Sequence, residues 1–176
     1  MATGKRLTGV ERTFEPDEII VTKTDLKGRI LYANDVFLEI SGYSEEELLG
    51  QPHSMIRHPD MPRAVFKLLW DRIEAGLEVF AFVVNLSKSG DHYWVLAHVT
   101  PSVDSEGVPR GYHSNRRAPA QESLEVIRPL YRILRDIEKN AADPKTGLAA
   151  SSARLTEEVA RAGFASYDRF VLSLAR

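Results

Sequence analysis

The sequence of 176 residues contains no cysteine. Disulfides, thiolate catalysis, iron–sulfur clusters and thiolate-bound zinc are therefore excluded, and a thiol-based switch is excluded with them. Any redox sensing by this chain needs a bound cofactor. The chain also lacks an excess of either charge, because 23 Lys and Arg residues face 25 Asp and Glu residues, for a net charge of −2. This balance gives no reason to expect nucleic acid or an anionic membrane as a partner.

Long apolar runs are missing as well. The first 18 residues contain no apolar stretch and do not resemble a signal peptide. The longest apolar run, Val79–Val84, is far shorter than the roughly 20 residues that a membrane-spanning helix needs. We therefore expect a soluble, cytoplasmic protein without direct membrane insertion. Nucleophile–base motifs, phosphate-binding loops and paired carboxylates are also missing, so we expect no enzyme.

Hydrophobic periodicity divides most of the chain into short elements. The predicted strands are Glu18–Thr24, Arg29–Ala33, Val79–Leu86, His92–Thr100 and Gly111–Arg117. Predicted helices begin at Asn34 or Asp35, at Ser44 and at Arg63, and they end at Gly42, Gly50 and Gly76. Two strands, then helices, then three strands indicate an α+β fold with one antiparallel sheet and helices on one face. We expect these helices and the proline-containing loop 51–62 to enclose a pocket against the sheet.

The last third of the chain has a helical period. A first apolar stripe covers residues 124–137, with Pro129 inside it, so we expect a kink or a late helix start there. Asp143 and Pro144 interrupt the pattern before a second stripe. The segment 164–172 is aromatic and amphipathic and needs a surface to bury on. We predict an N-terminal arm at 1–18, a sensory domain at 19–118 and a C-terminal helical extension at 119–176.

Two motifs are more specific than this pattern. The segment 51–62 reads QPHSMIRHPDMP, and residues 90–95 read GDHYWV. Both resemble signatures of the PAS domain in bacterial aerotaxis receptors, and the match covers roughly residues 20–135. The resemblance implies a PAS fold that binds FAD non-covalently and relays its redox state to a signalling partner, which the sequence does not name. It also favours a homodimer. Aerotaxis receptors continue into a membrane anchor and a coiled coil, whereas this chain resembles a free-standing PAS protein.

The loop of the first motif supplies three candidate site residues. The planar guanidinium of Arg57 can donate two parallel hydrogen bonds to the oxygens of a pyrophosphate. Asp60 could orient Arg57 or His58, or bind a ribose hydroxyl. The alternative is a loop in which Asp60 pairs with Arg57 and no ligand is bound. The spacing of His53, His58 and Asp60 does not favour a metal site. His58 as the axial ligand of a haem is a further alternative.

Amide side chains suit the donor and acceptor edge of a flavin ring. Asn85 ends a buried-looking strand and needs a partner, whereas Asn34 has a helix cap as an equally good role. Tyr93 and Trp94 point to opposite faces of one strand, so only one of them can face the pocket. The candidate cofactor-binding residues are Asn34, His53, Arg57, His58, Asp60, Asn85 and Tyr93.

One departure weakens the flavin hypothesis. Flavin-binding relatives carry a tryptophan after the Gly76 turn, whereas this chain has Val79. His113 and Asn115 also occupy positions that are usually apolar. Two alternatives to an FAD sensor therefore stay open, a haem-binding PAS sensor and a cofactor-free PAS module for protein interaction or dimerisation.

Overall fold

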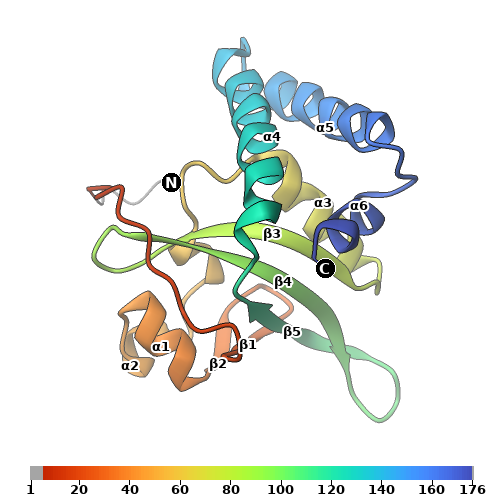
Figure 1. The fold of residues 1–176 in the computed structure, drawn as a ribbon. Helices are drawn as coiled ribbons and strands as arrows, with labels where there is room; N and C mark the ends of the chain where they lie inside the picture. The colour runs from red at the N-terminus through yellow and green to blue at the C-terminus, as the bar shows by residue number, and fades with distance from the viewer. Residues whose placement is uncertain (1–5, 176) are drawn as a thin grey trace.

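The computed structural model describes residues 6–175 and has a five-stranded sheet at its centre (Figure 1). The strands are β1 (Ile20–Asp25), β2 (Ile30–Ala33), β3 (Val79–Leu86), β4 (His92–Val103) and β5 (Pro109–Arg117). Their order across the sheet is β2-β1-β5-β4-β3, and every neighbouring pair is antiparallel. The predicted sheet is therefore confirmed. Because β1 pairs with β5, the first hairpin joins the last three strands, and β2 and β3 become the two edges.

Three helices and one turn connect β2 to β3. They are α1 (Asp35–Ser41), α2 (Glu45–Leu48), a 3₁₀ turn (His53–Ile56) and α3 (Arg63–Glu74). Asn34 caps α1 by accepting from the Phe37 N–H, and Ser44 and Glu47 form the expected capping box on α2. Gly42 ends α1 with a φ of 73°, which glycine adopts without strain. Helices α1 and α2 follow the sequence prediction closely because their caps are local signals.

The C-terminal extension packs partly on the other face of the sheet and partly on α3. It consists of α4 (Gln121–Asn140), α5 (Pro144–Arg161) and α6 (Tyr167–Leu174). The ring of Tyr131 on α4 lies 5.9 Å from the ring of Trp94, and its hydroxyl donates to the carbonyl of Phe82 at 2.5 Å. In Figure 1, α4 crosses the sheet and α5 turns back beside it. Helix α4 starts at Gln121 and continues through Pro129, whose ring is exposed, so the alternative of a late start is wrong.

The amphipathic segment 164–172, which was expected to need a burial surface, packs on β3. Helix α6 packs against β3 and buries Tyr167, Phe170 and Val171. The Asp168 carboxylate accepts from the Phe80 N–H and pairs with Arg72 on α3 at 2.7 Å. No helix within residues 6–175 is long and apolar enough to cross a membrane.

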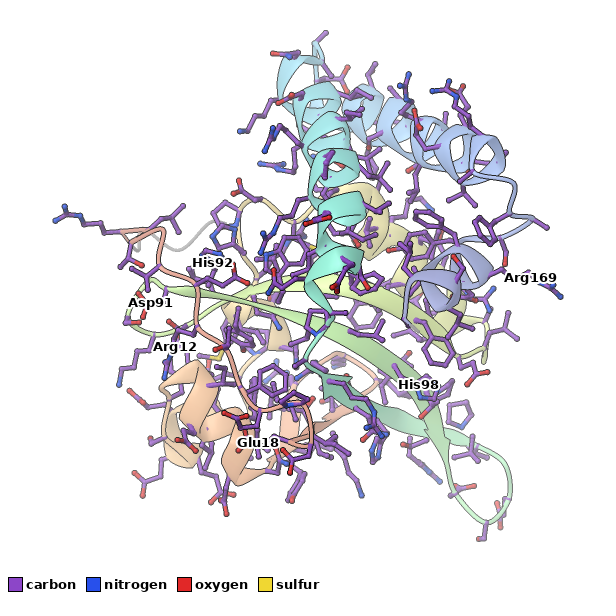
Figure 2. All side chains as sticks on the ribbon, in the orientation of Figure 1. Arg12, Glu18, Asp91, His92, His98 and Arg169 are labelled. Atoms are coloured by element: carbon purple, nitrogen blue, oxygen red, sulfur yellow. The ribbon has the colours of Figure 1, made fainter. Side chains whose placement is uncertain are left out.

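The N-terminal arm pairs with β4 where β5 has ended. The Val10 carbonyl accepts from the His92 N–H at 2.9 Å, and the Arg12 N–H donates to the His92 carbonyl at 2.7 Å. The hydroxyl of Thr8 donates to the Asp91 carboxylate at 2.6 Å. Figure 2 shows Asp91 and His92 beside this arm. The arm therefore runs along the start of β4 at residues 8–12, and residues 1–5 lie outside the described part of the chain.

Candidate functional site

A cavity of about 640 Å³ lies between the sheet and α3. Its floor is the inner face of β1, β3, β4 and β5, which carries Thr22, Thr24, Val83, Asn85, Ala97, Val99, Tyr112, Ser114 and Arg116. Residues of the 52–57 loop, of α3 and of the first turn of α5 form its other walls. A volume of this size is typical of small-molecule and cofactor sites.

Unpartnered polar atoms gather on the floor of this cavity. Among residues 6–175, the Asn85 amide nitrogen, the Ser114 hydroxyl and Nη1 of Arg116 are buried without a hydrogen-bond partner. The residues themselves are 3%, 7% and 4% exposed. Buried polar groups are nearly always hydrogen-bonded, because an unsatisfied one costs about 1–3 kcal/mol. Three such groups that converge on one cavity indicate a polar ligand.

Arg116 places a positive charge at the centre of this floor. Its Nη2 donates to Nε2 of His53 at 2.5 Å and to the Thr22 hydroxyl at 2.8 Å. Burial lowers the pKa of Arg116 to about 10, which still leaves the guanidinium charged at neutral pH. His53 accepts with Nε2, so its proton sits on Nδ1, and its ring stacks on Phe37. Burial and the Arg116 charge lower the pKa of His53 well below its usual value.

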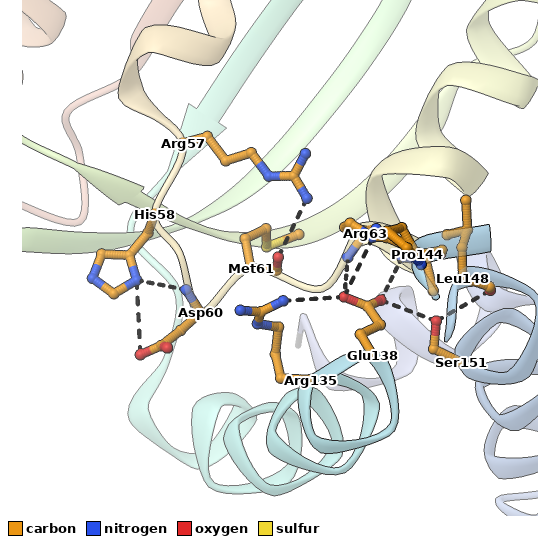
Figure 3. Close-up of polar contacts among 11 residues, drawn as sticks. Arg57, His58, Asp60, Met61, Arg63, Arg135, Glu138, Pro144, Leu148 and Ser151 are labelled. Carbon is orange, nitrogen blue, oxygen red and sulfur yellow. Dashed lines mark hydrogen bonds and ion pairs between the residues drawn. The ribbon is translucent and has the colours of Figure 1, made fainter. Parts of the chain in front are cut away.

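The loop that carries the first motif covers the free edge of β3. Arg57 forms an isolated bridge with Asn85, and its guanidinium lies 4.1 Å from the centre of the Phe66 ring. Neighbouring residues of extended backbone point to opposite sides. Arg57 therefore lines the cavity on the inner face, whereas His58 points to the outer face (Figure 3).

His58 and Asp60 line a second cavity, of about 400 Å³, between the N-terminal arm, the outer sheet face and α4. Nδ1 of His58 accepts from the Asp60 N–H at 3.1 Å, and burial lowers the pKa of His58. Asp60 is largely exposed and does not pair with Arg57, so the ligand-free loop closed by that pair is not what the structure shows. As a haem ligand, His58 would act in this second cavity. Within residues 6–175, no three His, Asp or Glu side chains could hold a metal ion together.

The two remaining candidates differ. The Asn34 side chain accepts from the N–H groups of Val21 and Phe37 and donates to the Ile19 carbonyl, so the cap and the β1 contact use its hydrogen bonds. Tyr93 is fully buried on the inner face, paired with Asn85 across β3 and β4. Its hydroxyl has no partner among the described residues, and burial raises its pKa well above the usual value. The structure thus brings His53, Arg57 and Asn85 to the first cavity, with Tyr93 beside them.

Comparison with known proteins agrees with this geometry. The sequence profile described as "PAS fold" matches residues 30–116. The aerotaxis receptor of Escherichia coli (strain K12) is 44% identical over 118 residues, which is 67% of this chain and 23% of that receptor. Residues 30–116 form a PAS domain. The resemblance to the aerotaxis-receptor subfamily and the PAS fold are confirmed.

More distant matches carry the same fold. Phototropin-1A of Oryza sativa subsp. japonica is 35% identical over 78 residues, 44% of this chain and 8% of the phototropin. The light-state structure of the blue-light photoreceptor Aureochrome1 LOV is 26% identical with a TM-score of 0.54, and the match covers 63% of this chain and 88% of that one. The chain spans less than a quarter of the length of either of these two curated relatives.

The PAS domain contains site residues that the sequence reasoning missed. Trp70 on α3 lines the cavity and meets the Tyr112 ring edge-on at 5.7 Å, so an aromatic wall exists although Val79 itself belongs to a buried apolar cluster. Ser114 and Arg116 alternate with His113 and Asn115 along β5. This alternation could have identified Ser114 and Arg116 from the sequence, because alternate residues of a strand lie on the same face of the sheet.

Proposed function

We propose that this PAS domain is a signalling sensor that binds FAD non-covalently in the cavity of about 640 Å³ and responds to redox state or oxygen. The observation that carries this proposal is the set of unpartnered groups on the inner face, namely the Asn85 amide, the Ser114 hydroxyl and the Arg116 guanidinium. Amide, hydroxyl and guanidinium groups together can bond to the edge of a flavin ring, which carries both hydrogen-bond donors and acceptors. The similarity to an aerotaxis receptor and to LOV photoreceptors supports a flavin.

The charge of the cavity supports a phosphate-bearing ligand. Among the described residues, six cationic side chains line it, Lys27, Arg57, Arg63, Lys67, Arg116 and Lys145, and no carboxylate does. Arg57 has no carboxylate bonded to it among the described residues. Its Nη2 makes one long hydrogen bond, of 3.5 Å, to the Met61 carbonyl, and its other N–H groups can bind phosphate oxygens. The aromatic rings of Phe66 and Trp70 supply apolar wall area on the same side. His58 and Asp60, which line the other cavity, would act on the ligand only through the Arg57 loop.

The sheet offers a route from the cavity to the C-terminal helices. A bound flavin would supply reversible redox chemistry, with a change of ring protonation on reduction. The Asn85 amide can donate to or accept from the ring, so its orientation can follow the protonation state. Asn85 lies on β3, whose Phe82 carbonyl accepts from Tyr131 of α4 and which also carries α6. We propose that the output is a shift in how α4 and α6 pack on the sheet, read by a separate signalling partner, with the chain acting in the cytoplasm as a homodimer.

Identification of the bound compound tests the function. Protein purified without added cofactor would be heat-denatured, and the released compound identified by chromatography against FAD, FMN and haem standards. Stoichiometric FAD is the expected result. A colourless protein that stays colourless after incubation with FAD would overturn the proposal.

A further inference from the structure

The first turn of α5 forms part of the wall of the cavity. Pro144, Lys145 and Leu148 line it, opposite Arg63 and Lys67 of α3. Helix α5 lies beyond residues 30–116, which the PAS profile matches. The cavity wall therefore includes a helix that follows the five-stranded sheet and the residues that the profile matches.

A buried carboxylate holds α5 in this place. Glu138 of α4 accepts from the N–H groups of Arg63 and Ala64 at 3.1 and 3.0 Å, and from the Ser151 hydroxyl at 2.9 Å (Figure 3). Its side chain is 2% exposed, and Arg135 pairs with it at 3.2 Å. One side chain thus caps the start of α3 and binds α5, while the Arg63 guanidinium donates to the Pro144 carbonyl. The position of α5 relative to the cavity is set by specific bonds.

Close backbone packing fixes α5 further. A Cβ atom at Gly147 would lie 3.1 Å from the Glu138 carbonyl oxygen and 3.0 Å from Cβ of Ala141. Glycine lets the first turn of α5 approach the end of α4 this closely, whereas a Cβ atom would have to push these neighbours away by a few tenths of an ångström. The adjacent Lys145 is thereby held at the rim of the cavity.

Lys145 is a cation that lacks a counter-charge. Its side chain is exposed and has no ion pair with any described residue. The nearby Asp143 carboxylate is turned to its own helix, where it accepts from the N–H groups of Lys145 and Thr146, and it does not line the cavity. Lys67 pairs with Asp71 at 2.5 Å, whereas Lys145 reaches the same cavity from another helix without an ion pair to any described residue. No acid among the described residues lines the cavity, so the unpaired Lys145 can attract an anion.

We propose that Lys145 binds the phosphate end of the cavity ligand, and that Glu138 is the positioning residue that holds α5 for this contact. The inference rests on the proposed flavin function and adds a ligand-binding residue from the C-terminal extension. Ligand binding and the packing of α5 on α3 are then thermodynamically coupled, because a ligand that bonds to Lys145 stabilises the docked position of α5.

The affinities of riboflavin, FMN and FAD separate the phosphate contact from ring binding. They would be measured by fluorescence quenching for wild type, Lys145→Ala and the control Lys139→Ala, an exposed cation on α4 that lines the other cavity. Lys145→Ala should weaken the binding of FAD, or of FMN and FAD together, by roughly 2- to 5-fold and leave riboflavin binding unchanged, because an exposed charge contact is worth up to about 1 kcal/mol. A loss for FAD alone assigns the contact to the second phosphate, and a loss for both assigns it to the shared phosphate. An unchanged ratio of FAD to riboflavin affinity overturns the inference.

Inorganic pyrophosphate provides a readout that does not need flavin. Titrated into the cofactor-free full chain, it should shift the backbone amide NMR signals of residues 145–148 in wild type and Lys139→Ala but not in Lys145→Ala. Absence of flavin binding together with these shifts would overturn the proposed function and keep the anion contact. No shift at residues 145–148 together with an unchanged ratio of FAD to riboflavin affinity would reject the contact itself.

Discussion

The Nη2 atom of Arg116 lies 2.5 Å from Nε2 of His53, on the floor of the larger cavity. The same guanidinium donates to the Thr22 hydroxyl, yet its Nη1 has no partner among the described residues. No carboxylate of residues 6–175 lines this cavity. A buried cation that contacts only neutral groups carries a desolvation penalty, and contacts with an anionic or polar ligand can offset this penalty.

Replacing Arg116 should separate ligand binding from stability. Arg116→Met is expected to weaken FAD binding by about 10- to 100-fold, because hydrogen bonds to charged groups are worth about 1.5–3 kcal/mol. The free energy of unfolding of the cofactor-free protein should be unchanged or higher, since the desolvated charge is removed. Flavin titration and urea unfolding measure the two quantities. Arg117→Met, at the exposed next position, is the control and should change neither. Equal affinities for Arg116→Met and wild type would rule out the assigned contact.

The depressed pKa of His53 predicts a loss of stability in acid. Folded His53 stays neutral well below pH 6.5, whereas the unfolded chain takes up a proton near that pH. The free energy of unfolding should therefore be unaffected above about pH 6.5 and fall as the pH drops below it, by up to about 1.4 kcal/mol per pH unit for this proton. His58, whose pKa is also lowered, adds to the slope.

His53→Gln keeps an acceptor near Arg116 and cannot titrate, so it should flatten this dependence. Urea unfolding at pH 7.5 and pH 5.5 measures the difference for each variant. His113→Gln, on the outer face of β5, should behave as wild type. If the free energy of unfolding changes between pH 7.5 and pH 5.5 by the same amount in His53→Gln and in wild type, the assignment to His53 is wrong.

Tyr131 joins the sheet to two helices of the extension. Its hydroxyl donates to the Phe82 carbonyl and lies 2.9 Å from the Tyr167 hydroxyl, and burial raises the pKa of Tyr131. Tyr131→Phe should lower the free energy of unfolding by about 1–3 kcal/mol, because it leaves buried polar groups unsatisfied. The exposed Tyr32→Phe serves as the control in urea unfolding. If the two variants unfold alike, the hydrogen bonds of Tyr131 do not hold α4 and α6 to β3.

Glu138 should matter more for stability than any exposed acid of the extension. Glu138→Ala removes the cap of α3 and leaves Arg135 without its carboxylate, so we expect a loss of about 2–4 kcal/mol. Glu138→Gln keeps an acceptor oxygen and should lose less. Thermal and urea unfolding would be compared with Glu157→Ala, an exposed position on α5. Similar stabilities of Glu138→Ala and Glu157→Ala would refute this role.

The fold followed from the sequence because its signals are local. Strand β3 begins and ends at the predicted residues, and the caps at Asn34 and Ser44 mark the starts of α1 and α2. The PAS resemblance identified the loop 51–62. The division into an arm, a sensory domain and an extension at residues 18 and 118 stays a prediction.

The details of the site depend on long-range pairing that no local pattern encodes. Arg57 and His58 are adjacent in sequence, and only the pairing of Arg57 with Asn85 shows that they face different cavities. Residues 91–94 belong to the second motif, which the resemblance links to flavin binding. In the structure, Asp91 and His92 bind the N-terminal arm, whereas Tyr93 is buried on the inner face. Glu138 follows Leu134 by four residues on the buried stripe of α4, which is the signal that identifies it as a buried acid.

The visible absorbance spectrum of the purified wild-type protein tests whether the cavity holds a flavin. We expect a yellow protein with the two-band spectrum of an oxidised flavin, which bleaches on reduction with dithionite and returns in air. A Soret band would contradict it in favour of haem. A spectrum without visible bands, unchanged after incubation with FAD, would contradict it in favour of a module that works without a cofactor.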